Sequence, residues 1–234
     1  IETLKIREEF RKEFIGNVAH ELKTPIFTIQ GYIENLIDGA ITDEDVRDKF
    51  LNRAKISVER LIYIIKDLDM ITKFESGTLN LELDSFDINE LVQDVYEQLE
   101  IQAQKKEIKL IFNKNYPESI FVNGDKDKIE QVVTNLVINS IKYGTDKGTT
   151  EVSFESLTND KLIVRITDNG DGILKEHLSR LFERFYRVDQ SGSRKEGGSG
   201  LGLSIVKHII DAHNENIYIE SELGIGSEFS FTLS

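Results

Sequence analysis

Glycines crowd residues 197–202, which read Gly-Gly-Ser-Gly-Leu-Gly and precede a helical apolar pattern. Glycine lets backbone amides approach an anion closely, and the N-terminus of the following helix adds its partial positive charge. The stretch therefore predicts contact with the phosphates of a nucleotide, and the alternative is a flexible hinge. Its spacing matches neither the dinucleotide-binding fingerprint nor the P-loop, because no Gly-Lys pair occurs in the chain.

Two further groups could complete a nucleotide site. Asp168 ends a predicted strand and opens the sequence Asp-Asn-Gly-Asp-Gly; its carboxylate could accept a hydrogen bond from an amino-purine, and the alternative is an Asx turn. Asn135 and Asn139 lie one turn apart on a predicted helix, followed on the same stripe by Lys142 and Tyr143. Amide oxygens suit Mg²⁺, which takes phosphates as other ligands, and the alternative is a solvated helix surface.

His20 is a possible nucleophile in the first half of the chain. It lies two residues from both Val18 and Leu22 of an apolar stripe, about 200° from each in a helix, so we expect its imidazole in solvent. The steps from Val18 to Leu22 and from Leu22 to Ile26 are both four residues, a stutter that locally unwinds a coiled coil. Pro25 lies inside the stutter and removes a backbone donor, which predicts a kink that upstream helix motion could control.

Composition excludes several classes of protein. The chain has 234 residues and a net charge of −13, which argues against nucleic acid as a partner and against docking on an anionic bilayer. The absence of cysteine excludes disulfides and thiolate metal sites. We find neither an apolar run of roughly 18 residues nor a leader, and expect a fragment of a longer protein.

The first 74 residues predict two long helices joined by a short turn. Gly39 is the expected end of the first helix, and Thr42 or Asp43 the N-cap of the second. Apolar residues recur at steps of three and four in both helices, which is typical of a coiled-coil seam. One hairpin cannot bury two such seams, so we expect a second copy to complete a four-helix bundle. The alternative is that the seams pack on the C-terminal domain.

The rest of the chain, from residue 86, predicts an α/β sandwich with a mixed sheet and helices on one face. The first helix is expected to run through Ala103. The other predicted helices cover residues 126–143 and 201–213, and the predicted strands cover 108–113, 151–156, 162–168, 217–221 and 228–233.

Five segments together resemble known motifs. Residues 135–143, 168–173, 182–187 and 198–203 resemble the N, G1, F and G2 boxes of the ATP-binding domain shared by gyrase, mismatch-repair proteins and histidine kinases. Residues 14–25 resemble the H box of sensor histidine kinases. The order H, N, G1, F, G2 is also that family's order, and it covers nearly the whole chain.

The resemblance implies an α+β multidomain protein: an antiparallel helical hairpin forming a dimeric four-helix bundle, then a Bergerat-type α/β sandwich. Residues 1–14 would be a signalling helix from an upstream sensor, and 15–75 the dimerisation and histidine phosphotransfer domain. Residues 76–85 would be a linker and 86–234 the ATP-binding catalytic domain.

The resemblance also implies the reaction. His20 would be autophosphorylated by ATP and pass the phosphoryl group to an aspartate of a response regulator. Glu21 would bond the other imidazole nitrogen and take its proton, the alternative being a solvated acid. Thr24 would orient a water in a phosphatase reaction toward the regulator, or be an ordinary helix-surface residue.

ATP and Mg²⁺ are the cofactors that the resemblance implies. Asp168 would hold the adenine amino group, Asn139 would ligate the metal, and residues 189–200 would form a lid. No role follows for His177, His208 or His213. The implied ATP-binding residues are Asn135, Asn139, Lys142, Tyr143, Asp168, Gly170, Gly172, Ile173, Tyr186, Arg187, Gly198, Ser199, Gly200, Leu201 and Gly202.

Two competing functions are an ATPase of the gyrase type and an inactive nucleotide-binding scaffold. Gyrase-type ATPases place a water-activating glutamate where this chain has Asn135, so the sequence favours phosphotransfer. The expected partners are a second copy of the chain and a response regulator. The expected location is the cytoplasmic portion of a membrane-anchored bacterial receptor.

Overall fold

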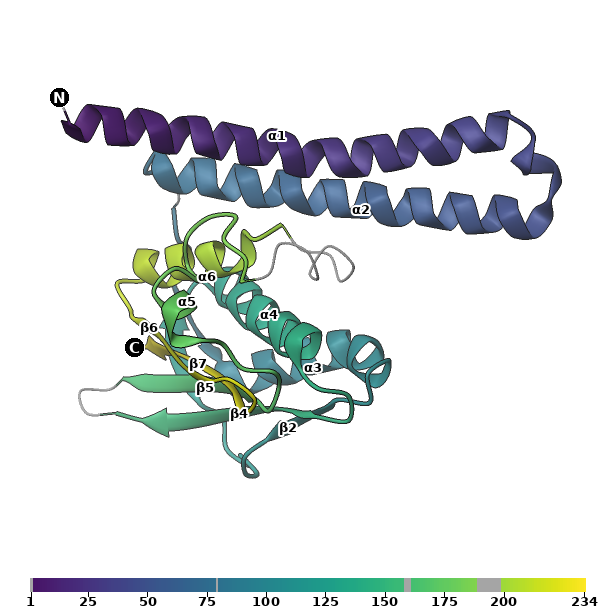
Figure 1. Cartoon of the computed structure of the whole chain (residues 1–234). Helices are drawn as coiled ribbons and strands as arrows, with labels where there is room; N and C mark the ends of the chain where they lie inside the picture. Colours follow the sequence, from purple (N-terminus) through teal and green to yellow (C-terminus); the bar gives the residue numbers. More distant parts are fainter. Residues whose placement is uncertain (1, 79, 158–160, 189–198) are drawn as a thin grey trace. The chain divides into compact units, whose positions relative to one another are not determined.

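The computed structural model describes residues 2–78, 80–157, 161–188 and 199–234, without the side chains of residues 2–11, 13 and 75. The chain divides into two compact units, Ile1–Ser76 and Gly77–Ser234. The first unit is helical, and the second combines helices with a sheet (Figure 1).

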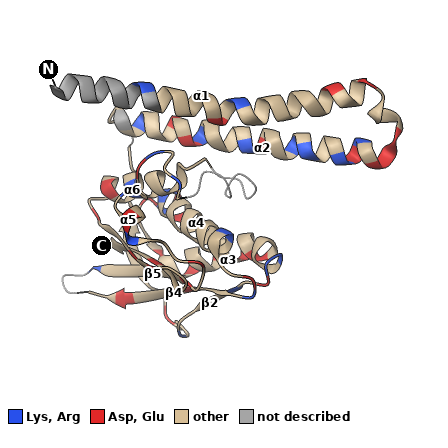
Figure 2. Ribbon diagram, viewed as in Figure 1, with Lys and Arg blue, Asp and Glu red and all other residues tan. Residues whose placement is uncertain are grey.

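The first unit is a hairpin of α1 (Glu2–Ile37), the short 3-10 helix η1 (Ala40–Thr42) and α2 (Glu44–Glu75). Gly39 has a left-handed φ of 116° where the chain leaves α1. Asp43 caps α2, because its carboxylate accepts the backbone N–H of Asp45 at 3.1 Å and of Val46 at 3.2 Å. Acidic residues gather at this turn (Figure 2). The predicted helical hairpin is confirmed, and α1 continues through Pro25.

The hairpin buries only part of its apolar surface. Leu36 of the predicted repeat is buried, and so are Ile64 and Ile71 of α2, which the predicted repeat did not include. Other positions of the repeat stay at the surface. No helix among the described residues is both long enough and apolar enough to cross a bilayer. The exposed apolar residues of the repeat include Ile26, Ile33, Leu51, Val58 and Ile65.

The second unit contains a five-stranded sheet in the order β2-β4-β5-β7-β6 and a two-stranded sheet of β1 and β3. In the larger sheet β2 and β4 are parallel and the other neighbours antiparallel. The helices are α3 (Ile88–Gln104), α4 (Lys126–Tyr143), α5 (Lys175–Leu178) and α6 (Gly202–Ala212). The strands are β1 (Asp84–Asp87), β2 (Lys109–Phe112), β3 (Phe121–Gly124), β4 (Thr149–Ser156), β5 (Leu162–Asp168), β6 (Ile217–Glu222) and β7 (Gly226–Leu233).

Helices α3, α4 and α6 cover one face of the larger sheet (Figure 1). Their apolar side chains, such as Leu91, Leu136 and Ile205, are buried together with Ile166 and Phe231 of the sheet. This arrangement confirms the predicted mixed sheet with helices on one face. The prediction lacked β1, β3 and α5, which have four residues each. The equally short β2 was predicted because it carries a run of three apolar residues, which the other three elements lack.

Candidate functional site

His20 lies on α1 and is exposed, as the helical pattern predicts. Thr24, one turn later, donates its hydroxyl hydrogen to the carbonyl oxygen of His20 at 3.3 Å. Thr28 donates in the same way to Thr24 at 2.8 Å. Hydroxyl groups on helices often bond backwards like this. His20 and Thr24 therefore share one exposed turn of the helix.

Glu21 directs its carboxylate to α2, where Oε2 lies 3.2 Å from Nη2 of Arg60. The two side chains are only 18% and 30% exposed. The resemblance places Glu21 beside the imidazole of His20, whereas the structure pairs it with Arg60. The sequence contains no signal for Arg60, because 39 residues separate the partners.

α4 separates its apolar residues from its polar residues as predicted. Ser140 faces inward and shares a hydrogen bond of 2.6 Å with the Thr150 hydroxyl. On the other stripe, the Lys142 ammonium lies 4.8 Å from the ring centroid of the exposed Tyr143. Asn135 and Asn139 are half-buried, so their amides can reach a ligand at the surface of this unit. The buried inward residues are Ile129, Val132, Val133, Leu136 and Ser140.

Asp168 ends β5 between β4 and β7, opposite Thr150 and Ser227. Its Oδ1 accepts the Gly170 N–H at 2.9 Å, which is the Asx turn considered as the alternative. Burial raises the pKa of the Asp168 carboxyl, and hydrogen bonds from Gly170 and Ser227 act in the opposite sense. A carboxylate has about four acceptor positions, so the turn leaves Asp168 able to accept a further hydrogen bond.

Gly170 brings the turn after β5 against the end of α4. A Cβ at this position would lie 2.4 Å from the Tyr143 carbonyl oxygen and 2.9 Å from Cα of Gly144. The same carbonyl oxygen of Tyr143 accepts the N–H of Asp171 at 3.3 Å. Only a glycine allows this approach. The two predicted segments, 168–173 and 135–143, therefore meet in the fold.

Gly172 is required by backbone packing. Its φ is +67°, and a Cβ there would lie 1.9 Å from the carbonyl oxygen of Glu222 on β6. Neighbouring bonds join the same segments: Gly224 donates to the Asp171 carbonyl at 2.7 Å, and Ile173 donates to the Ser221 hydroxyl at 2.8 Å. Gly172 and Ile173 thus contact the end of β6, and Asp171 bonds to the turn that follows it. Sequence reasoning did not foresee these contacts.

At the start of α6, two other predicted segments meet, residues 182–187 and residues 198–203. Phe185, with φ of 62°, donates its N–H to the carbonyl of Gly200, with φ of 73°, at 2.9 Å. Ser199 accepts the Leu201 N–H at 3.2 Å, and Leu201 is fully buried. A Cβ on Gly202 would lie 3.5 Å from Oδ1 of Asn135. Gly198 and residues 189–198 of the expected lid lie outside the described residues.

Tyr186 has polar and cationic neighbours in the segment before α6. Its hydroxyl lies 2.7 Å from Nδ1 of His177, and the Arg180 guanidinium lies 4.3 Å from its ring centroid. Arg187 is half-buried. Sequence reasoning assigned no role to His177, because nothing in its spacing points to a tyrosine nine residues later.

His213 links the ends of two helices that carry predicted site residues. Its Nε2 accepts the backbone N–H of Asp125, which caps α4, at 2.9 Å, and Nδ1 lies 2.8 Å from the carbonyl of Ile209. A carbonyl can only accept, so the imidazole is neutral with its hydrogen on Nδ1. His208 contacts Arg184, with 3.3 Å between Nε2 and Nη2. The contacts of His213 fit a structural role.

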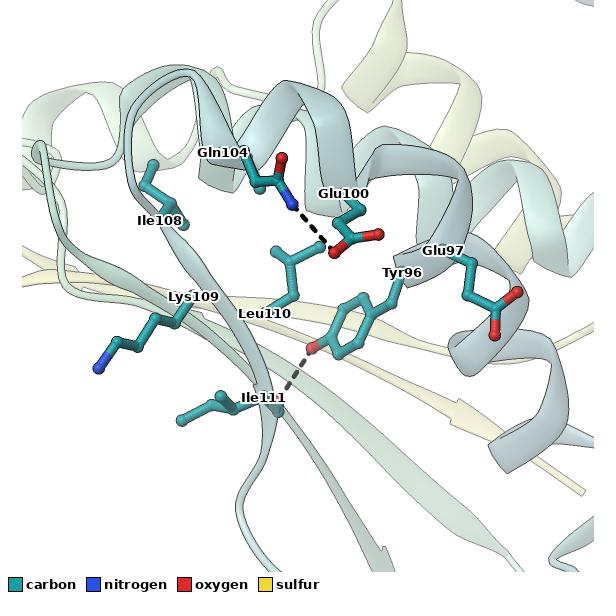
Figure 3. A pocket seen from close by; sticks show the side chains of 9 residues that line it. Tyr96, Glu97, Glu100, Gln104, Ile108, Lys109, Leu110 and Ile111 are labelled. Carbon is teal, nitrogen blue, oxygen red and sulfur yellow. Dashed lines mark hydrogen bonds between the residues drawn. The ribbon is translucent and has the colours of Figure 1, made fainter.

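A surface groove of about 510 Å³ lies between α3 and β2 (Figure 3). Tyr96 donates its hydroxyl hydrogen to the Ile111 carbonyl at 2.9 Å, and Gln104 donates to Glu100 at 3.0 Å. The residues that line this groove include none of the predicted ATP-binding residues. The groove is therefore separate from the segments that meet around Asn135 and Gly170.

The donor set constrains how a metal could bind. Within the described ranges, no three His, Asp or Glu side chains are grouped so that they could enclose an ion. The half-buried amide of Asn139 offers one oxygen. These residues fit an ion such as Mg²⁺, which keeps several waters and takes phosphate oxygens as ligands.

Two family profiles match the chain. The family described as His Kinase A (phospho-acceptor) domain matches residues 10–77. The family described as Histidine kinase-, DNA gyrase B-, and HSP90-like ATPase matches residues 124–234. The sensor histidine kinase WalK of Bacillus subtilis is 35% identical over 228 residues, which are 97% of this chain and 37% of that protein. The chain thus spans just over a third of that relative.

Solved histidine kinases share the fold. Acinetobacter baumannii histidine kinase AdeS matches with a TM-score of 0.72 and 30% identity over 92% of this chain and 97% of that chain. Histidine kinase ThkA, solved in complex with response regulator protein TrrA, matches with a TM-score of 0.73 and 26% identity over 98% and 63%. With a matching profile in each unit and a histidine kinase matched over nearly its whole solved length, this chain belongs to the sensor histidine kinase family.

Proposed function

We propose that this chain is an ATP-dependent protein-histidine kinase that phosphorylates His20 and passes the phosphoryl group to an aspartate of a response regulator. The observation that carries the proposal is the exposed imidazole of His20, in a chain whose second unit belongs to the histidine kinase and gyrase ATPase family. Asn135 stands where gyrase-type enzymes have a glutamate to activate water. Without that base, the γ-phosphoryl is kept for His20.

The nucleotide would be held by the segments that meet around α4. Asp168 would accept a hydrogen bond from the adenine amino group, because it has acceptor positions beyond those used by Gly170 and Ser227. Asn135 and the N-terminus of α6 at Gly202 adjoin one another and would contact phosphates. Lys142 and Arg187 would add positive charge there, and Tyr143, Tyr186 and the glycine-rich segment would line the site.

Asn139 would ligate a Mg²⁺ ion through its amide oxygen. When bound with the nucleotide, this ion neutralises phosphate charge and orients the group that is transferred. The protein's part would be to present this half-buried amide from α4.

His20 would act as nucleophile. One ring nitrogen attacks the γ-phosphorus, the bond between that phosphorus and the bridging oxygen breaks, and its electron pair leaves with ADP. Glu21 takes the proton from the other ring nitrogen. Phosphoryl transfer needs mainly in-line positioning and charge neutralisation, and a solvent-exposed imidazole can meet both the ATP-binding unit and a receiver protein.

A receiver domain is the proposed second partner. The structure of histidine kinase ThkA with response regulator protein TrrA supports this choice, because that kinase matches 98% of this chain. In a separate phosphatase reaction Thr24 would orient a water toward the phosphoaspartate, which releases inorganic phosphate and restores the aspartate. Its hydroxyl bonds a backbone carbonyl at the long distance of 3.3 Å, so it can turn to water at little cost.

Anchoring in a membrane remains a prediction of the resemblance.

A second copy of the chain is the proposed dimer partner. Residues of the hairpin repeat such as Ile26, Ile33 and Val58 are 48%, 47% and 42% exposed. A matching surface on another hairpin would bury them in a four-helix bundle. Sedimentation equilibrium should give a molecular mass twice that of one chain. The Ile33→Glu substitution should lower the measured mass toward that of a single chain.

Incubation with γ-labelled ATP and Mg²⁺ tests the reaction. A kinase gives a protein label that is stable to alkali and labile to acid, and His20→Gln removes it while the fold is retained. Release of free phosphate without a label would indicate the gyrase-like ATPase instead. Neither product would indicate a nucleotide-binding scaffold.

A further inference from the structure

Arg60 makes a contact with the proposed catalytic apparatus that the motifs do not contain. It reaches from α2 to α1 and places Nη2 3.2 Å from Oε2 of Glu21. Both side chains are mostly shielded from water. Its Nε atom is buried, and within the described part of the chain it has no hydrogen-bond partner. The guanidinium is thus fixed at one end by Glu21.

Stability alone does not explain this arginine. A buried N–H without an acceptor costs free energy, which offsets what an ion pair contributes. Arg53 offers a direct comparison, because it lies seven residues earlier on the same face of α2 and also reaches α1. It donates to the hydroxyl of Tyr32 at 3.2 Å in an exposed setting. Of these two arginines, Arg60 is the one that contacts a residue next to His20.

We propose, on the basis of the proposed function, that Arg60 is a positioning residue for Glu21 during autophosphorylation. Arg60 engages Oε2, and no donor among the described residues bonds Oε1. A guanidinium stays charged throughout the working pH range, so it anchors the carboxylate while Oε1 stays available. Oε1 then receives the proton that the His20 imidazole releases as its other nitrogen bonds to phosphorus.

Single and double substitutions test this role. We compare initial rates of phosphohistidine formation for Arg60→Gln, Glu21→Gln and the double variant, with Arg53→Gln as the matched control. Arg60→Gln should lower the maximal rate about 10- to 100-fold, because a misplaced base is inefficient, and leave the KM for ATP unchanged. Arg53→Gln should retain the normal rate. In the double variant the rate should equal that of Glu21→Gln, because Arg60 acts only through Glu21.

Arg60→Lys provides a second measurement if Arg60→Gln does not fold. It keeps the charge but not the planar fork, so it should be several-fold slower than the parent protein, and this loss should vanish when Glu21 is already glutamine. A rate for Arg60→Gln equal to that of Arg53→Gln would overturn the proposal. So would losses that multiply in the double variant. An unlabelled parent protein would instead overturn the proposed function, and the positioning role with it.

Discussion

The two units hold their predicted site residues in different ways. In the hairpin, His20, Glu21 and Thr24 lie within about one turn of α1, and regular helix geometry sets their spacing. In the second unit, segments far apart in the sequence meet through close backbone contacts, such as Gly170 at Tyr143 and Gly172 at Glu222. An added Cβ on either glycine should therefore disturb the fold of the second unit, whereas one on a helical glycine of the hairpin should be tolerated.

The largest expected effect is that of Gly172→Ala. The new Cβ atom would lie only 1.9 Å from the Glu222 carbonyl oxygen, and a φ of +67° is unfavourable for alanine. We expect a loss of about 3 kcal/mol or more in the free energy of unfolding, measured by urea denaturation. Gly224→Ala is the control, since Gly224 also has a positive φ but nothing lies within 4 Å of its added Cβ. Equal losses for both would show that packing is not the cause.

Asp168→Asn should separate binding from stability within the second unit. We expect the affinity for ATP to fall about 100-fold, or about 2.7 kcal/mol, because an amide that rotates to accept at one position disturbs the other contacts. The raised pKa of Asp168 means that the ionised carboxyl weakens the fold at neutral pH, and that this penalty fades as the pH falls through the folded-state pKa.

Isothermal titration and urea denaturation check these two expectations for Asp168→Asn. The variant should match or exceed the stability of the parent protein at neutral pH, and should have lost this advantage at about pH 4, the ordinary pKa of an unfolded aspartate. Unchanged affinity for ATP would remove Asp168 from the proposed site.

Glu215→Gln tests a buried carboxyl group whose pKa is lowered, whereas that of Asp168 is raised. Burial acts to raise the pKa of Glu215, yet hydrogen bonds from Lys161, Ser234 and Thr232 leave it lowered. The lysine lies at 2.7 Å and both hydroxyls at 2.5 Å. A lowered pKa adds stability above the unfolded-state pKa, and this stability is lost as the pH falls through the folded-state pKa.

We expect Glu215→Gln to lose about 2 kcal/mol of unfolding free energy at neutral pH and less in acid. Urea denaturation across the acid range measures the difference. Glu220→Gln, at an exposed position of β6, should leave the curve unchanged. A constant loss at every pH would mean that the charge of Glu215 is not responsible.

The smallest effect is expected in the hairpin, from Gly31→Ala. Gly31 lies inside α1, and nothing outside the local helix backbone comes within 4 Å of an added Cβ. Alanine should raise the free energy of unfolding by about 1 kcal/mol, because glycine costs a helix conformational entropy. Thermal unfolding followed by circular dichroism measures this gain. A loss of stability would mean that hairpin glycines are as constrained as those of the second unit.

Periodicity predicted the long elements well. α4 covers the expected residues 126–143, and the turn at Gly39 and Asp43 follows from the cap chemistry of those two residues. The strands β1 and β3 escaped prediction because their sequences, Asp-Ser-Phe-Asp and Phe-Val-Asn-Gly, contain no apolar run like that of the equally short β2. The inward position of Ser140 was visible from spacing, but its Thr150 partner was not.

The candidate site also combines local features that the sequence predicted with tertiary contacts that it did not. The sequence by itself determined which residues could do chemistry, because His20, Asn139 and Asp168 stand in recognisable local patterns. Only the tertiary structure decided their partners: Arg60 for Glu21, Tyr143 for Gly170, and His213 for the cap of α4. The physical reason is that a helix or turn is specified by neighbours along the chain, whereas a contact across 39 or 88 residues depends on how separate elements pack.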